Sequence, residues 1–150
     1  DYIHGLRGPG VLLIAHGAQI GVDDSDGRWG LAYRRKRDEP GPIGEKLLDA
    51  LGRALAVAHL AQQTAPLAGE LPIGAGELWV RIHTRLLGPS TSATYEALRG
   101  EIAMALEPLY GAPVGVTQQS EPGELFGVRV RASSEPGVEE LLARLARSAG

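Results

Sequence analysis

The hydrophobic and polar positions of the chain follow two different periods, and the change of period divides the sequence into strands and helices. Residues 11–15 form a short, continuous apolar run, which predicts a strand buried on both faces. The alternation over residues 18–22 indicates that the extended structure continues. Aspartates, a serine and a glycine fill residues 23–27 and predict a turn, because these residues tolerate turn conformations. We therefore expect residues 28–37 to return as the second arm of a hairpin.

Three segments repeat apolar residues at the spacing of one helix face. Leucine and alanine recur three and four residues apart over residues 43–63, which predicts a long amphipathic helix. A second helix is expected after residues 88–92, whose hydroxyl side chains can cap it, and Gly111 should end it. A third helix is expected to follow Pro136.

Strict alternation returns in three further segments, which predict strands over residues 78–87, 114–120 and 125–132. The first of these has an aliphatic face, formed by Leu78, Val80, Ile82, Thr84 and Leu86. Its other face carries aromatic and basic residues, because successive side chains of a strand point in opposite directions.

The expected order is β-β-α-β-α-β-β-α, which predicts the α+β class. We expect one two-layer sandwich, with a mainly antiparallel (mixed) sheet of about five strands and helices on one face, ferredoxin-like or related. The prediction is a single domain over residues 1–150, with an irregular leading segment at 1–10 and loops at 38–42 and 64–76. A doubly wound parallel fold is disfavoured, because it requires a stricter alternation of strands and helices.

Composition narrows the possible functions. Hydrophobic residues make up 43% of the 150 residues, which suits a chain with a core. The absence of cysteine excludes disulfides, thiol catalysis and cysteine-bound metals. No apolar run approaches the roughly 18 residues of a membrane span, and the first residues lack a secretory pattern, so we expect a soluble, cytoplasmic protein. The chain begins with Asp1 rather than Met, which suggests trimming, processing or excision from a longer chain.

The formal net charge of −3 disfavours a uniformly basic nucleic-acid binder but leaves room for a local basic surface. The strands place basic residues opposite their aliphatic faces, while many acidic residues fall on the predicted helices. If the helices cover the aliphatic face, the other face of the sheet presents Trp79, Arg81, His83, Arg85, Arg129 and Arg131. A further basic run, Arg34 to Arg37, ends the first hairpin.

Such a basic face has several interpretations. It could bind a phosphorylated or other anionic small molecule, or a single-stranded nucleic acid with Trp79 as a stacking platform. It could also face a second subunit in a homo-oligomer, with Trp79 and Leu87 supplying apolar contact. A plain solvated face, with arginines paired to acids across strands, fits the same pattern. The main prediction is a binding or assembly module without a membrane partner.

The alternative is a small metal-handling or acid/base enzyme centred on His16. Residues 11–17 (VLLIAHG) resemble the opening strand of the small tetrapyrrole metal chelatases, in which a His before Gly helps to hold the metal. The resemblance implies that His16 and His83 hold a metal, and the same two residues are the candidates for catalysis. The chain departs from that family at Ala18, where serine is expected, and in the sequence around His83. The sequence identifies no cofactor.

Two further motifs have a simpler interpretation. The acidic loop at residues 23–27 resembles a cation loop, but the positions required for an EF-hand are occupied by Val22 and Tyr33, which favours a hairpin turn. Residues 88–92 could bind an anion at the start of a helix, but almost every helix has such a cap, which favours the capping interpretation. His59 falls on the leucine stripe of its helix, which indicates packing rather than ligand binding.

Overall fold

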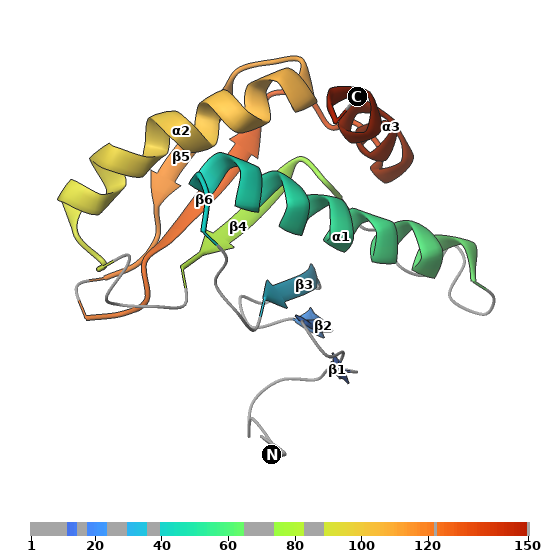
Figure 1. The fold of residues 1–150 in the computed structure, drawn as a ribbon, viewed down its shortest axis with the longest axis horizontal. Helices are drawn as coiled ribbons and strands as arrows, with labels where there is room; N and C mark the ends of the chain where they lie inside the picture. The colour runs from blue at the N-terminus through green and yellow to red at the C-terminus, as the bar shows by residue number, and fades with distance from the viewer. Residues whose placement is uncertain are drawn as a thin grey trace. The chain divides into compact units, whose positions relative to one another are not determined.

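The computed structural model shows an α+β protein (Figure 1). It describes residues 12–14, 18–23, 30–35, 40–64, 74–82, 89–121 and 123–149. These residues contain three helices and two small antiparallel sheets. They divide into two compact units: the described residues within 1–40 and 50–73 form the first, and those within 41–49 and 74–150 form the second. The prediction of one domain over residues 1–150 stays a prediction.

The first unit contains the sheet β1-β2-β3, formed by β1 (Leu12–Ile14), β2 (Ala18–Asp23) and β3 (Gly30–Arg35). The predicted hairpin is present, since β2 pairs antiparallel with β3 and places Ile20 opposite Tyr33. The prediction of one continuous extended segment over residues 11–22 is wrong. β1 and β2 are separate antiparallel strands, with Leu13 opposite Ile20.

The second unit contains the sheet β4-β6-β5, formed by β4 (Glu77–Arg81), β6 (Gly127–Ala132) and β5 (Val114–Gln118). The prediction of one five-stranded sandwich is therefore wrong, and a ferredoxin-like arrangement is not confirmed. Alternation of side chains predicts that a segment is extended but does not say which strand it pairs with. For that reason the strands of two sheets were predicted to form one sheet. The predicted strand over residues 78–87 corresponds to β4, and residues 83–88 lie outside the described part of the chain.

The three predicted helices are confirmed as α1 (Ile43–Gln63), α2 (Ser92–Tyr110) and α3 (Val138–Ser148). Gly111 ends α2 in the left-handed conformation, with φ of 67°, which is the role its position predicted. The buried stripe of α1 consists of Leu51, Leu55 and Ala58. None of the helices in the described part of the chain combines the length and the apolar character needed to cross a membrane.

The core of the second unit lies between the aliphatic face of its sheet and α2. Val128 and Val130 of β6 are each 1% exposed, and Ile102 and Leu106 of α2 are buried as fully. Figure 1 shows α2 running beside β5, and the Tyr95 hydroxyl of α2 donates a 2.7 Å hydrogen bond to the Val116 carbonyl. This packing leaves the opposite face of the sheet for polar residues.

The first turn of α1 belongs to the same unit and approaches α2 closely. A Cβ atom added at Gly44 would lie 3.2 Å from the Cβ of Ala105. The backbone N–H of Gly44 donates to Oε1 of Glu101 at 3.2 Å, which satisfies one of the amides that the start of a helix leaves without a partner. Glycine is thus the residue that lets the two helices meet here.

Candidate functional site

The cross-strand register of β4 and β6 builds a polar face on the second sheet. Trp79 lies opposite Arg129, Glu77 lies opposite Arg131, and Arg81 lies opposite Gly127. Residues that face each other across an antiparallel pair project from the same side of the sheet. The structure therefore brings Trp79, Arg81, Arg129 and Arg131 together, and we call these four residues with Glu77 the basic sheet face.

Trp79 is the centre of this face. The guanidinium carbons of Arg81 and Arg129 each lie 4.8 Å from the centroid of its ring. Cation–π contacts of this kind contribute about 0.5–1 kcal/mol at exposed sites and about 2 when desolvated. Trp79 is 38% exposed, so the ring holds two cations in place while remaining open to solvent. The sequence predicted the shared face, but the stacking of two arginines on one ring depends on the pairing of β4 with β6.

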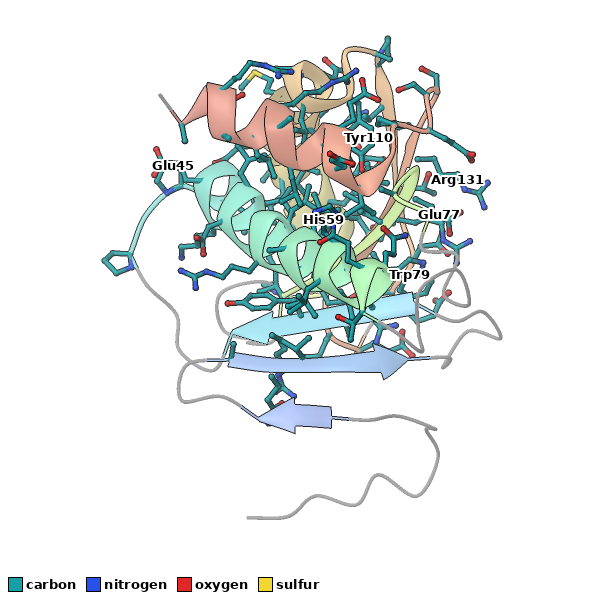
Figure 2. The ribbon with its side chains drawn as sticks, turned by 90° about the vertical axis from the view of Figure 1, so that its right-hand side faces the viewer. Glu45, His59, Glu77, Trp79, Tyr110 and Arg131 are labelled. Carbon is teal, nitrogen blue, oxygen red and sulfur yellow. The ribbon has the colours of Figure 1, made fainter. Side chains whose placement is uncertain are left out.

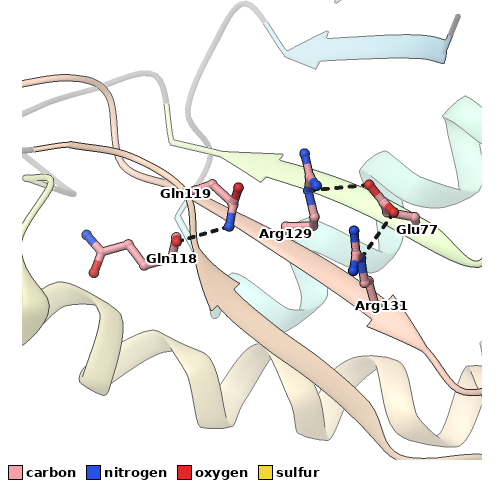
Figure 3. A network of polar contacts seen from close by, with 5 residues as sticks. All are labelled: Glu77, Gln118, Gln119, Arg129 and Arg131. Atoms are coloured by element: carbon pink, nitrogen blue, oxygen red, sulfur yellow. Dashed lines mark hydrogen bonds and ion pairs between the residues drawn. The ribbon is translucent and has the colours of Figure 1, made fainter. Parts of the chain in front are cut away.

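A carboxylate also belongs to this face, and sequence reasoning missed it. The Oε1 atom of Glu77 lies 3.3 Å from Nε of Arg129, and its Oε2 atom lies 3.2 Å from Nε of Arg131 (Figure 3). Figure 2 shows Glu77 beside Arg131. Glu77 was overlooked because the strand was expected to begin at Leu78. Its position two residues before Trp79 is the signal that could have found it, since residues two apart share a strand face.

The charges of the face do not cancel. Three arginines and one glutamate leave a net charge of +2 on the basic sheet face. The Glu77 side chain is 24% exposed and that of Arg129 is 21% exposed, so this pair is partly shielded from water. Arg81 is exposed, and the structure shows it in no ion pair with another described residue. Arg81 is thus the cation best placed to meet a ligand.

A pocket of about 190 Å³ lies beside Arg81 and Trp79, and the connection between β5 and β6 forms its other wall. Ser120 and Glu124 come from that connection. Ser120 is held firmly, because its hydroxyl accepts from Ser90 Oγ at 2.7 Å and from the backbone N–H of Gly127 at 3.0 Å. The side chain of neighbouring Gln119, which is exposed, turns back to the Gln118 carbonyl at 3.3 Å (Figure 3). The pocket therefore has a polar wall held by hydrogen bonds, next to a cation that stacks on Trp79, and its lining also includes the exposed acid Glu124.

The structure describes only some of the other residues that the sequence singled out. His16, His83 and Arg85 lie outside the described residues, so a metal-holding or catalytic role for the two histidines stays a prediction. Within the described ranges, no group of three or more His, Asp or Glu side chains could hold a metal ion. Arg34 is an exposed residue of the first unit, and His59 is half-buried on α1.

The structure tests one of the two short motifs, residues 88–92, but not the acidic loop at residues 23–27. Most of residues 23–27 lies outside the described part of the chain. Thr91 caps α2, since its Oγ1 atom accepts from the backbone N–H of Thr94 at 3.2 Å. This supports the capping interpretation of residues 88–92 at that threonine.

Comparison of the chain with protein-family models, with curated proteins and with solved structures found no match.

Proposed function

We propose that the protein is a binding module that takes an anionic small molecule on its basic sheet face. The observation that carries this proposal is the pair of guanidinium groups held on the ring of Trp79, each 4.8 Å from its centroid. Arginines fixed before binding lose little side-chain entropy when a ligand arrives, so more of the interaction energy appears as affinity. A simple solvated sheet surface has no need of this preorganisation.

The pocket indicates the size of the group that is bound. Its volume of about 190 Å³ lies below the ~300–1,000 Å³ of sites that enclose a whole drug-sized molecule. A phosphate or a similar anionic head group suits it better, with Arg81 donating from the open side. The remainder of the ligand would extend across the face toward Arg129. The acidic residues Glu77 and Glu124 disfavour a long polyanion as the natural ligand of a single protomer.

The test is a titration with pyrophosphate, followed through the indole N–H signal of Trp79 in two-dimensional NMR spectra. We expect Arg81→Ala to weaken binding roughly tenfold to a hundredfold, because a hydrogen bond to a charged group contributes about 1.5–3 kcal/mol. Arg147→Ala is the matched control, since Arg147 is another exposed arginine, in the last turn of α3. A wild-type protein that does not respond, or an equal loss in both variants, would contradict the proposal.

A substitution of Glu77 should change the affinity in the opposite direction, toward tighter binding. Glu77→Gln keeps the shape of the side chain but raises the net charge of the face from +2 to +3. It also removes the internal carboxylate that competes with a ligand for Arg131. We expect pyrophosphate to bind several times more tightly, and to lose that gain in high salt. Weaker binding would show that Glu77 orients the arginines rather than opposing the ligand.

A further inference from the structure

The second sheet ends at β5, and the register shows which of its backbone groups face outward. The backbone N–H of Gln119 donates to the Gly127 carbonyl at 3.0 Å, and the pairs Thr117–Arg129 and Gly115–Arg131 continue that ladder. Because hydrogen-bonded and non-hydrogen-bonded pairs alternate in an antiparallel ladder, Val114, Val116 and Gln118 direct their N–H and C=O groups away from β6.

Side chains of α2 engage only part of this outer edge. Tyr95 donates to the Val116 carbonyl, and the Val114 amide donates weakly to Oε1 of Glu107 at 3.4 Å. The structure gives the amides of Val116 and Gln118 no acceptor among the described residues. An edge with outward N–H groups is a template for pairing with another strand, and natural edges are usually blunted by charge or proline. The sequence of β5, VGVTQ, contains neither.

A groove lies directly beside this edge. Its volume is about 360 Å³, and its lining comes from α2 and β5: Glu96, Arg99, Gly100, Ala103, Val114 and Val116. Gly100 faces open space, because no atom lies within 4 Å of where its Cβ would be. At the rim, Nε of Arg99 and Oε2 of Glu96 are 2.9 Å apart, and both side chains are more than half exposed. Small and apolar residues thus form the floor, and one acid and one base form the rim.

We infer that the occupant of this groove is a second copy of the chain, paired through β5 about a two-fold axis. In such a symmetric contact, residue i of one protomer meets residue j of the other, and j meets i. Antiparallel pairing centred on Val116 sets Val114 opposite Gln118 of the partner and lets the outward amides find acceptors. The acid and the base on the rim match this symmetry, since Glu96 of each copy can meet Arg99 of the other. The small residues Gly100 and Ala103 let the two α2 helices approach.

The first experiment measures molar mass by light scattering and sedimentation over a wide range of protein concentration. Val116→Pro removes one outward N–H without removing a hydrogen bond to β6, so it should give a monomer with native circular dichroism. Val116→Ala keeps the N–H and is the matched control, which should remain dimeric. A wild-type protein that is monomeric at every concentration overturns the proposal. A folded Val116→Pro variant that stays dimeric overturns it as well.

A charge exchange tests the same interface without altering the backbone. Arg99→Glu places acids opposite acids at both symmetric contacts and should weaken dimerisation roughly fivefold. The double variant Glu96→Arg with Arg99→Glu restores one acid and one base on each rim and should recover the wild-type dimerisation constant. Failure of the double variant to recover, with the single variant weakened, would show that these side chains do not meet across the two-fold axis. A wild-type monomer that instead accepts an unrelated extended peptide in the groove would also overturn the proposal.

Discussion

At the scale of single residues, Tyr110 shows how burial couples a side chain to stability. It is 2% exposed, and its hydroxyl donates a 2.5 Å hydrogen bond to the Ala75 carbonyl. Tyr110→Phe leaves that carbonyl without its donor, which should lower the free energy of unfolding by about 1–2 kcal/mol at neutral pH. Urea denaturation of the two proteins measures this difference. An unchanged midpoint would show that Ala75 finds another donor.

The same residue predicts a pH dependence. Burial raises the pKa of Tyr110 from 10.0 to about 12, because the ionised phenolate is poorly solvated inside the protein. Below pH 10 the phenol is protonated in both states, and its contribution to stability is fully present. Between pH 10 and 12 the unfolded chain loses the proton first, so the wild type should lose stability relative to Tyr110→Phe, by up to roughly 3 kcal/mol. Parallel loss in both proteins would contradict this assignment.

The basic sheet face shows which parts of a site a sequence can predict. The period of two places Trp79 and Arg81 on one side of β4, and Arg129 and Arg131 on one side of β6. It does not say that the two strands are neighbours, or that Trp79 lies directly opposite Arg129. Glu77 was missed for a related reason, since the residue at which a strand begins depends on its partner strand rather than on its own hydropathy.

At the scale of elements, the cap of α2 provides a direct test of local stability. Thr91 has extended backbone angles, φ −131° and ψ 157°, and its side chain satisfies the amide of Thr94. Thr91→Ala should therefore lower the free energy of unfolding by about 1 kcal/mol. Thr91→Ser keeps the hydroxyl and should remain close to the wild type, as thermal or urea denaturation would show. A serine variant as unstable as the alanine variant would assign the loss to the methyl group instead.

The elements differ in how well the sequence predicted them, and the difference is physical. The periodic leucines after Pro42 predicted α1 over residues 43–63, and the structure has the same bounds, because helical hydrogen bonds form within one segment. β1 and β2 were merged because alternation is the same whether a chain continues straight or turns back. Strand pairing joins residues that are distant in sequence, and hydropathy carries little information about it.

At the scale of the whole molecule, the two proposals together predict where the two basic sheet faces of a dimer lie. A two-fold axis that pairs β5 with its copy in an antiparallel manner is perpendicular to the sheet. The corresponding faces of the two sheets therefore point in the same direction. The six strands would then run β4-β6-β5 and on into the partner as β5-β6-β4. Trp79, Arg81 and Arg129 of both copies would lie on the same side of one continuous sheet.

That arrangement predicts that dimerisation raises the affinity for long anions but not for short ones. A short anion such as pyrophosphate contacts one basic sheet face, so the wild type and Val116→Pro should bind it equally well. A long polyphosphate can reach both faces of a dimer, and linking two contacts raises the apparent affinity without any new interaction. The wild type should therefore bind polyphosphate roughly tenfold or more tightly than the Val116→Pro variant, with a steeper dependence on salt.

Isothermal titration of both anions into both proteins tests this, with Val116→Ala as the dimeric control. Equal affinity of wild type and Val116→Pro for polyphosphate, with a confirmed dimer in the wild type, would place the two basic faces too far apart or on opposite sides. Loss of pyrophosphate binding in Val116→Pro would instead mean that the site needs the second copy. Because Arg81→Ala should weaken both anions in the dimer, the same titrations on that variant separate failure of the site from failure of the interface.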